Sequence, residues 1–529
     1  MTPWQHVTRI GMLMAAAAAL LGWIVLHSEP TFADGLRYIH QAERIEGGGW
    51  RDGLSNGVDH PLHPLGIAVT HRLIGGVEPA SWQRAALVLA FACIVLLVIP
   101  VYLLSLELFG AQSAWVACLF VTVNPIVADI VVNVLSESTF LLWWTFGLWC
   151  GIRFLRDGRF LWLPPAICMG GLAYLTRPEG MLLPAALAAA LLISPLCRAT
   201  RIEWPRWWRA MAFLAAGPTI LVGPYMAIKG GVGTKPGIAR VLGLAPQAEP
   251  LALERGKPVP PGQSTYQTYR LATYRMIRAF RVGVTAPLFP FALFGLALAT
   301  RLPSRARAGL FLSIVLAASA VALVRLHATG GYCTARHGLI PGMLLTMASA
   351  HAITWLLCKI SIPGRWLGRP GDSFGTGPVF RTIVVGALMI MVLKIQDLGP
   401  LNPGPYSVYH ATSDWLTRNT RTGERVLDLT GWPLYLSALS GYNFADVYEA
   451  PADPATRWIV VRQPHVEGHW YYSHVIRELI GGRAPVAQVP PRATPNQLQI
   501  LIFDRQAPPP QMAATTSLRD AVTRARSLE

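Results

Sequence analysis

A polar segment that begins with an acid follows directly after the first apolar stretch of the chain. It runs from Thr31 to Leu73 and carries Asp34 near its start. A carboxylate can act as a general base, and an acid just past a membrane exit is where an enzyme that acts on a lipid carrier would place its chemistry. Such chemistry requires a membrane topology that holds Asp34 at the bilayer surface.

The composition is that of a polytopic membrane protein. Of the 529 residues, 53% are hydrophobic and only 14% are charged. The net charge of +17 indicates anchoring of cytoplasmic loops and contact with membrane lipids or phosphate groups. It does not indicate a nucleic-acid partner, because no basic run alternates with aromatic residues. The seven cysteines form neither a metal-ligand spacing nor a disulfide framework, so we expect no redox chemistry.

The apolar stretches predict an all-α membrane bundle of about eleven transmembrane helices. Several stretches are short enough to need flanking residues or little tilt, and the last is limited by Arg381 and Lys394. The stretches are 10–26, 85–104, 114–132, 139–155, 161–175, 181–196, 211–228, 284–300, 310–324, 339–357 and 379–395.

Basic residues in alternate short loops predict the orientation of these helices. They follow the fourth, sixth, eighth and tenth stretches, beginning at Arg153, Arg198, Arg301 and Lys359. Because such residues accumulate on the cytoplasmic side, we expect a multi-pass protein of the plasma (inner) membrane with a cytoplasmic amino terminus. The Asp34 segment, the loop 230–283 and the carboxy-terminal tail would then lie outside. A cleavable signal is an alternative interpretation of the first stretch, although no clean cleavage site follows it.

The long first outer loop contains two segments in which apolar residues recur at helical spacing, 36–45 and 62–73. Two amphipathic helices lying in the plane of the membrane interface would fit this pattern. Two helices that merely cover the bundle would fit it equally well, and the sequence leaves both arrangements open.

The sequence changes character after the last apolar stretch. We predict a membrane domain over residues 1–400, a small extracytoplasmic α/β domain over 401–505 and a disordered tail over 506–529. Strands are predicted from ERVLDLTG, RWIVVRQP and QLQILIFDR, and helices from SVYHATSDWLTRN and WYYSHVIRELIGG. The sequence shows no long internal repeat, which argues against a transporter built from duplicated halves.

A series of short motifs resembles, in its order, that of a known enzyme superfamily. The motifs are Asp34 with Tyr38, HPLHPL with His60 and His63, NP at Asn124, LSES with Glu137, LTRPEG with Arg177 and Glu179, and TARHGLIP with Arg336. Together they resemble the GT-C superfamily of integral-membrane glycosyltransferases. The nearest branch is the protein-mannosyltransferase-like and aminoarabinose-transferase-like group, which uses polyprenyl-phosphate sugars. The resemblance extends over residues 31–341.

The resemblance implies a single displacement that inverts the anomeric configuration of the sugar. Loss of a polyprenyl phosphate needs cations more than a proton, whereas the acceptor hydroxyl must lose a proton as it attacks. By match to the motifs, Asp34 is the base, and Arg177 and Arg336 bind the donor phosphate. The supporting residues implied are Tyr38, His60, His63, Glu137 and Glu179.

Each of these residues also has a structural interpretation. Asp34 could cap the helix that starts beside it, Arg177 with Glu179 could anchor a hairpin at the membrane edge, and Glu137 could be a first-turn acid favoured by the helix dipole. For His60 and His63 we expect surface or interface positions. Many members of the superfamily carry a second acid where this chain has Gly35, so a metal site is in doubt, although Asp34 alone could hold a divalent ion.

The sequence thus favours an inverting glycosyltransferase with a polyprenyl-phosphate-linked sugar as donor. The acceptor would be a protein, a lipid or a polysaccharide on the extracytoplasmic side of the membrane. The alternative is a secondary transporter or flippase for an amphipathic anion, in which Arg177, Arg336 and Asp129 would line a pathway. A membrane scaffold that presents the carboxy-terminal domain is a third interpretation.

Overall fold

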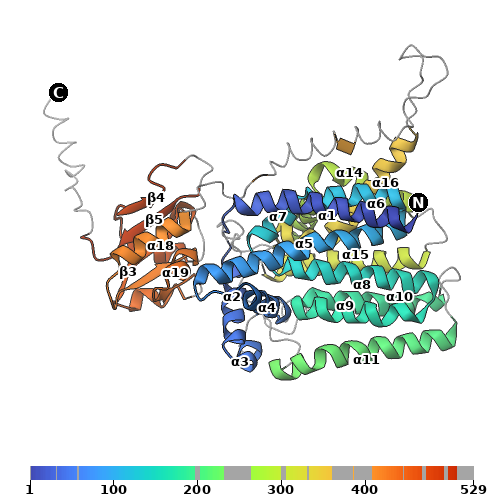
Figure 1. Cartoon of the computed structure of the whole chain (residues 1–529), viewed down its shortest axis with the longest axis horizontal. Coiled ribbons are helices and arrows are strands. Elements are labelled where there is room, and N and C mark those ends of the chain that lie inside the picture. Colours follow the sequence, from blue (N-terminus) through green and yellow to red (C-terminus); the bar gives the residue numbers. More distant parts are fainter. Residues whose placement is uncertain are drawn as a thin grey trace, which may run out of the picture. The chain divides into compact units, whose positions relative to one another are not determined.

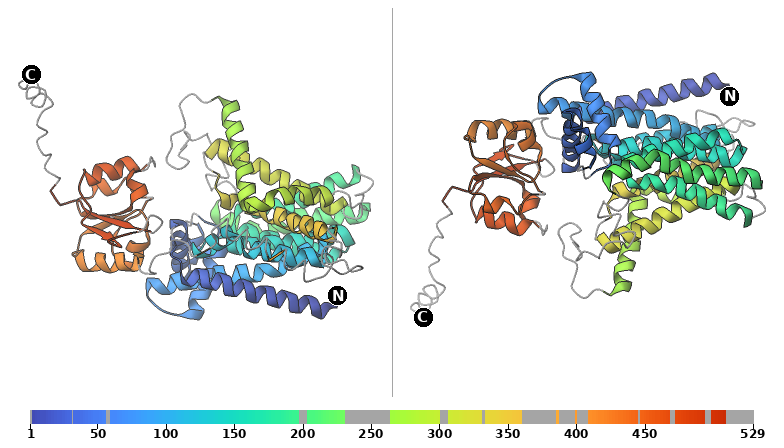
Figure 2. Two further views of the ribbon diagram at one scale, coloured as in Figure 1. Left: turned by 90° about the horizontal axis from the view of Figure 1, so that it is seen from above. Right: turned by 90° about the horizontal axis from the view of Figure 1, so that it is seen from below.

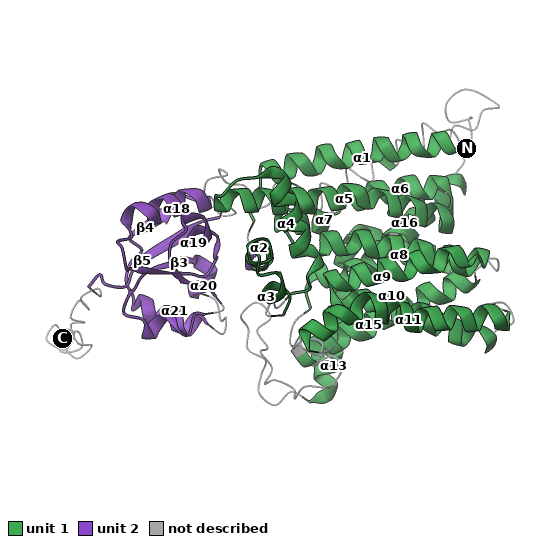
Figure 3. Cartoon of the chain, turned by 60° about the horizontal axis from the view of Figure 1, so that its bottom comes forward, with its two compact units in different colours: residues 1–30, 34–252, 259–401 green, residues 31–33, 253–258, 402–529 purple. Residues whose placement is uncertain are grey.

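The computed structural model of the chain divides into two compact units (Figure 3). The first comprises residues 1–30, 34–252 and 259–401, and the second comprises residues 31–33, 253–258 and 402–529. The residues that the structure describes are 2–30, 32–55, 59–196, 203–230, 264–299, 306–330, 333–359, 385–386, 399, 408–444, 446–467, 472–493 and 498–508.

The first unit is a bundle of helices (Figure 1). Local signals set several helix ends: Thr2 forms a capping box with Gln5 at the start of α1, and Gly158 ends α8 in a left-handed conformation. The helices are α1 (Pro3–Leu26), α2 (Ala33–Glu46), α3 (Trp50–Ser55), α4 (Leu62–Ile74), α5 (Pro79–Phe109), α6 (Ala111–Thr122), α7 (Pro125–Val132), α8 (Glu137–Asp157), α9 (Leu163–Thr176), α10 (Leu182–Ile193), α11 (Trp204–Lys229), α13 (Thr265–Gly283), α14 (Phe289–Ala299), α15 (Ala306–Gly330) and α16 (Leu339–Lys359), with the short 3-10 helices η2 (Pro178–Met181) and η7 (Ala335–Gly338) between them.

The bundle is that of a polytopic membrane protein. Within the described part of the chain, five helices are long and apolar enough to cross a membrane, or up to seven if each of two bent helix pairs forms one span. Every apolar stretch predicted between residues 10 and 357 is largely helical, which confirms the helical assignment, although the stretch 114–132 is divided between α6 and α7. The last predicted stretch, 379–395, lies almost entirely outside the described residues. The number of about eleven spans stays a prediction.

Large side chains fill the space between α5, α6 and α8 in the interior of the bundle. Tyr102, Phe120 and Trp144 are each at most 1% exposed. Helix α5 packs along α6 and α8, and α14 packs along α16 (Figure 1). Because these helices are apolar on nearly all sides, the surface that is not packed inside the bundle is suited to lipid.

Two pairs of consecutive helices in the bundle are sharply bent. The axes of α6 and α7 differ by 50°, and those of α13 and α14 by 98°. Asn124 joins the two bends: it caps α7, and its Nδ2 donates to the carbonyl of Gly283 at 2.8 Å. Next to this contact, a Cβ at Gly338 would lie 2.4 Å from the Ala279 carbonyl oxygen. Only glycine therefore allows η7 to approach the backbone of α13 so closely.

The two amphipathic segments of the first outer loop both form helices, as predicted. In α2 the apolar residues Leu36, Ile39 and Ala42 are buried. In α4 the predicted apolar face is instead exposed, with Val69 52% and Leu73 83% accessible, and the opposite face is buried. An exposed apolar stripe fits a helix at the membrane interface better than one that merely covers the bundle.

The second unit contains a five-stranded sheet of order β2-β1-β3-β5-β4. Strands β1 (Arg425–Asp428), β2 (Gly441–Tyr442) and β3 (Thr456–Arg462) are parallel, whereas β5 (Ile500–Asp504) runs antiparallel to β3 and to β4 (Ala487–Val489). Helices cover both faces of the sheet (Figure 2). They are α18 (Val408–Asn419), α19 (Trp432–Ser437), α20 (Gln463–Glu467) and α21 (Ser473–Ile480).

The sequence identified the longer elements of this sheet and missed the shorter ones. Each of the three segments predicted as strands contains one, and the two predicted helices correspond to α18 and α21. The short strands β2 and β4 gave no apolar alternation that could reveal them, because strands of two or three residues depend on their neighbours in the sheet.

Candidate active site

Two arginines from different elements bind the carboxylate of Asp34. Arg336, in η7, donates from Nη1 to Oδ2 at 2.9 Å, although the two residues are 302 positions apart in the sequence. Arg37, one turn further along α2, places Nη2 3.3 Å from Oδ1. The Asp34 side chain is 21% exposed and so remains accessible to a ligand. It lies within the first turn of α2, where the helix dipole also favours a negative charge.

The two arginines keep Asp34 ionised. Burial alone would raise the pKa of the Asp34 carboxyl, but the attraction of Arg336 and Arg37 outweighs burial and holds this pKa below its ordinary value. A carboxylate in this state accepts hydrogen bonds readily, yet it is a weak base as long as both arginines remain bound to it.

Glu137 links the two arginines that were predicted to bind phosphate. Its Oε1 lies 2.8 Å from Nη1 of Arg177 and 3.8 Å from Nε of Arg336. The Glu137 side chain is only 5% exposed. Arg177, at the junction of α9 and η2, also contacts Glu179 with Nη2 2.9 Å from Oε1. Asp34, Arg336, Glu137, Arg177 and Glu179 thus form one continuous chain of ion pairs, which we call the arginine network.

Tyr38 and Ser136 connect this network to the first outer loop. The Tyr38 hydroxyl and the Ser136 hydroxyl are 2.9 Å apart, and Nη1 of Arg177 lies 3.4 Å from the same serine oxygen. Burial raises the pKa of Tyr38, so its phenol stays neutral. Glu137 is the first residue of α8, and the predicted interaction with the helix dipole coexists with its ion pairs.

The predicted surface or interface position of His63 is wrong, because its side chain is 0% exposed. Its Nε2 lies 3.3 Å from the Val134 carbonyl and its Nδ1 lies 2.9 Å from the Thr139 hydroxyl. A carbonyl only accepts, so Nε2 carries the proton and Nδ1 accepts from Thr139. Val134 has a φ of 55°, which costs a β-branched residue about 1–3 kcal/mol. His63 therefore holds the strained turn that leads into Ser136 and Glu137.

His60 is also buried, at 6% exposure, which corrects its predicted surface or interface position as well. Its ring meets the edge of Tyr174 with centroids 4.9 Å apart and lies near Tyr225. His63 faces inward because α4 exposes its apolar face and buries the opposite one, whereas His60 lies just before this helix.

Two charged residues of the site were not found from the sequence. Arg37 bridges Asp34 and Asp59, with its Nε 3.3 Å from Oδ2 of Asp59, and the Asp59 side chain is 3% exposed. The spacing of Arg37 from Asp34 was an available signal, since residues three apart on a helix are neighbours. Asp59 gave no such signal, because only the folded loop brings it to the arginine.

The chain shares its fold with solved structures of other proteins. The apo oligosaccharyltransferase of Archaeoglobus fulgidus superposes with a TM-score of 0.63 at 13% identity, covering 90% of this chain and 71% of that one. Apo ArnT of Cupriavidus metallidurans superposes with a TM-score of 0.55 at 12% identity, covering 94% of this chain and 98% of that one. Residues 59–222 match the family model of dolichyl-phosphate-mannose-protein mannosyltransferase. The chain therefore shares the fold of these two proteins, and its part from residue 59 to residue 222 matches a mannosyltransferase family. No curated protein sequence matches that of this chain.

The charged residues around Asp34 do not fit a divalent metal ion. Both oxygens of Asp34 are engaged by arginines, and the neighbouring position is Gly35. Across the described parts of the chain, no group of three or more histidine, cysteine, aspartate or glutamate side chains is arranged to hold a metal ion. A cation brought to Asp34 would meet the positive charges of Arg37 and Arg336.

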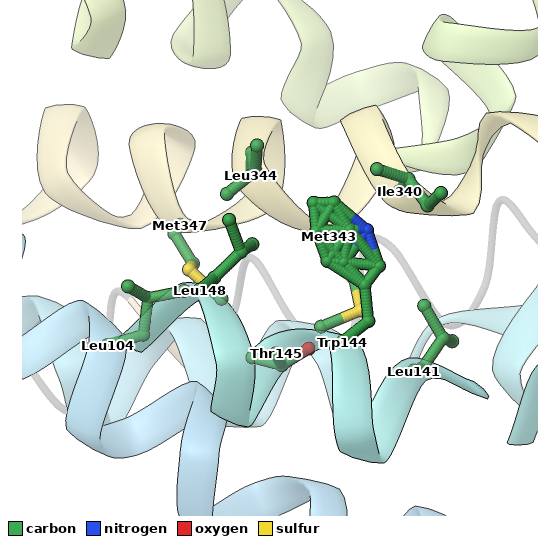
Figure 4. Close-up of a pocket in the computed structure, with 9 residues that line it drawn as sticks. All are labelled: Leu104, Leu141, Trp144, Thr145, Leu148, Ile340, Met343, Leu344 and Met347. Carbon is green, nitrogen blue, oxygen red and sulfur yellow. The ribbon is translucent and has the colours of Figure 1, made fainter. Parts of the chain in front are cut away.

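An apolar pocket lies one helical turn away from the arginine network (Figure 4). Leu141 follows Glu137 by one turn of α8, and Ile340 follows Arg336 by about one turn at the start of α16. The lining residues come from α5, α8 and α16 and are Leu104, Leu141, Trp144, Thr145, Leu148, Ile340, Met343, Leu344 and Met347. Along α8, and along the chain from η7 into α16, charged residues are thus followed by residues that line the apolar pocket.

Proposed function

We propose that this protein is a glycosyltransferase that moves a sugar from a polyprenyl-phosphate donor to an acceptor on the extracytoplasmic face of the plasma membrane, with inversion at the anomeric carbon. The observation that carries the proposal is the contact between Asp34 and Arg336, with Glu137 joining Arg336 to Arg177. It supports one site in which a base and two phosphate-binding cations act together.

Relatives of the same fold support the choice of donor. The oligosaccharyltransferase of Archaeoglobus fulgidus binds dolichol-phosphate in one structure, and ArnT of Cupriavidus metallidurans binds undecaprenyl phosphate in another. The matching family model is named for dolichyl-phosphate-mannose.

In the proposed reaction, the oxygen of an acceptor hydroxyl attacks the anomeric carbon and its proton passes to the Asp34 carboxylate. The bond between the anomeric carbon and the phosphate oxygen breaks, and its electron pair leaves with the polyprenyl phosphate. Arg177 and Arg336 bind the charge that develops on this leaving group. Attack and departure on opposite sides of the sugar invert its configuration.

The ion pairs of the free enzyme suggest how the base becomes active. While Arg336 binds Asp34, the pKa of the carboxyl is lowered. A donor phosphate beside Arg336 competes for the same guanidinium and weakens its hold on Asp34. The basicity of Asp34 then rises when the donor is bound, so proton transfer is coupled to the presence of the sugar phosphate.

The proposal includes the topology and the domain boundaries predicted from the sequence. The amino terminus is cytoplasmic, about eleven helices span the membrane, and the site and residues 401–505 are extracytoplasmic. In support, Asp34, Arg177 and Arg336 lie together and therefore on one side of the bundle. Most of the predicted tail 506–529 lies outside the described residues.

Substitution of Asp34 by Asn tests the proposal. In transfer assays with a synthetic polyprenyl-phosphate sugar and purified protein in nanodiscs, we expect Asp34→Asn to lower turnover by about 10²–10⁴-fold, the range of a lost general base. Binding of polyprenyl phosphate should persist, because Arg177 and Arg336 remain. Asp52→Asn, which changes an exposed acid of the same loop, is the matched control. Full turnover by Asp34→Asn would refute the assignment, and transport of the lipid without sugar transfer would favour a flippase.

A further inference from the structure

Helix α13 differs in chemistry from the apolar helices that surround it. It carries arginines at 270, 275, 278 and 281 and tyrosines at 266, 269 and 274, and it contains no acidic residue. A capping box of Ser264 and Gln267 begins it. None of the catalytic roles above uses its outer face.

One face of α13 packs against the bundle, and the opposite face is exposed. Ala272, Ala279 and Gly283 are buried and bring the helix close to the bundle. On the opposite face, side chains at intervals of three or four positions are exposed, so they form one stripe along the helix. The stripe consists of Tyr266 (74% exposed), Arg270, Tyr274 (60% exposed), Ile277 (48% exposed) and Arg281.

The direction of α13 places this stripe in the plane of the membrane surface. Helix α14 is apolar and packs along α16, as a membrane helix would. The axis of α13 is turned by 98° from that of α14, so α13 would run nearly parallel to a bilayer into which α14 inserts upright. Figure 2 shows this yellow-green helix running across the direction of the bundle. It packs against η7, the element that carries Arg336.

We propose that the exposed stripe of α13 is a docking surface for the headgroups of anionic phospholipids in the outer leaflet. Guanidinium groups pair with lipid phosphates in a bidentate manner. Tyrosine and isoleucine between the arginines insert at the level of the headgroups, as aromatic residues do at membrane interfaces. A soluble polyanion would match the arginines but would leave Ile277 and the tyrosine rings without an apolar partner.

This docking surface acts on the reaction through η7. Because Gly338 allows the backbones of η7 and α13 to touch, a membrane that fixes α13 also fixes the segment that positions Arg336. Asn124 adds a second tie, from the start of α7 to the last residue of α13. Anionic lipid is therefore expected to raise activity, in addition to the binding itself.

The test is native mass spectrometry of the detergent-purified full chain titrated with dioleoyl phosphatidylglycerol. One arginine at an anionic surface contributes about a factor of five in affinity, so we expect Arg270→Gln with Arg281→Gln to weaken phosphatidylglycerol binding about 30-fold. Phosphatidylcholine should bind equally to both proteins. The matched control is Arg418→Gln with Arg421→Gln, which removes two exposed arginines from the second unit.

Three outcomes decide the inference. Weaker phosphatidylglycerol binding by the α13 variant, with the control unchanged, supports the docking surface. Equal binding by the variant and the wild type overturns it. Loss of undecaprenyl phosphate binding with phosphatidylglycerol binding intact also overturns it, because the stripe would then serve the donor. Since this readout does not depend on turnover, a failure here leaves the role of Asp34 to be judged by its own experiment.

Discussion

Glu137 and Glu179 contact the same arginine at nearly the same distance but differ in burial. We therefore expect them to contribute unequally to the stability of the protein. Arg177 lies 2.8 Å from Glu137 and 2.9 Å from Glu179. The Glu137 side chain is 5% exposed, whereas that of Glu179 is 38% exposed. We expect Glu137→Gln to destabilise the protein strongly and Glu179→Gln to have little effect.

The magnitude follows from the geometry around Glu137. At the 2.8 Å separation, the attraction to Arg177 amounts to about 6 kcal/mol for an effective dielectric constant of about 20. Part of this is offset by the desolvation of both charges, so that breaking one buried pair costs about 3–5 kcal/mol. Arg336 loses a second, weaker contact at 3.8 Å. The exposed pair with Glu179 is worth about 0–1 kcal/mol, because solvent screens it.

Thermal unfolding of the two variants in one detergent provides the assay. For a chain of this size, 1 kcal/mol corresponds to about 1 °C, so Glu137→Gln should lower the midpoint by about 3–5 °C and Glu179→Gln by less than about 1 °C. Turnover of Glu137→Gln should also fall, since Arg177 and Arg336 are no longer held in place. Equal shifts for the two variants, or no shift for Glu137→Gln, would contradict the reasoning from burial.

Three further predictions concern pH, packing and metal. Burial lowers the pKa of His63 from 6.5 to about 4. Between these two pH values the imidazole is protonated in the unfolded chain but stays neutral in the folded protein. About 3 kcal/mol of stability should then be lost between pH 6.5 and pH 4, and a denaturation series in which His63→Gln shows the same slope would disprove this. Gly338→Ala should lower activity and the unfolding midpoint, because its Cβ meets the backbone of α13. Gly309→Ala in α15, where nothing lies within 4 Å of the added Cβ, should be neutral, and a similar loss in both variants would exclude this contact as the cause. Turnover should be insensitive to EDTA, since arginines occupy both oxygens of Asp34. Loss of activity in EDTA that only added divalent ions restore would contradict this expectation.

Several features of the site could be predicted because they are local or carry a strong pattern. The apolar stretches specify helices wherever they occur, since only helices satisfy their own backbone groups in a membrane. The spacing of Leu36, Ile39 and Ala42 predicted α2 and its buried face. Asp34, Arg177 and Arg336 could be named from short motifs, because those residues stand in a fixed order along the chain.

The histidines show where local pattern fails. For His63 the sequence indicates a surface or interface position, yet this residue supports a strained residue, Val134, in another part of the bundle. His63 is buried because of the orientation of α4. This orientation depends on which face of the helix is suited to lipid, and the mean hydropathy of the segment does not reveal that face.

The sequence by itself determined that the chain is an apolar helical bundle with an acid at the start of its first outer loop, since periodicity and composition are properties of neighbouring residues. Only the tertiary structure decided that Asp34 meets Arg336, that Glu137 stands between two arginines, and that Arg37 ties Asp34 to Asp59. Contacts between residues far apart in the chain depend on how whole helices pack. At Gly338 the backbone of η7 lies directly against that of Ala279 in α13. These two residues are too far apart in the sequence for a local pattern to reveal their contact.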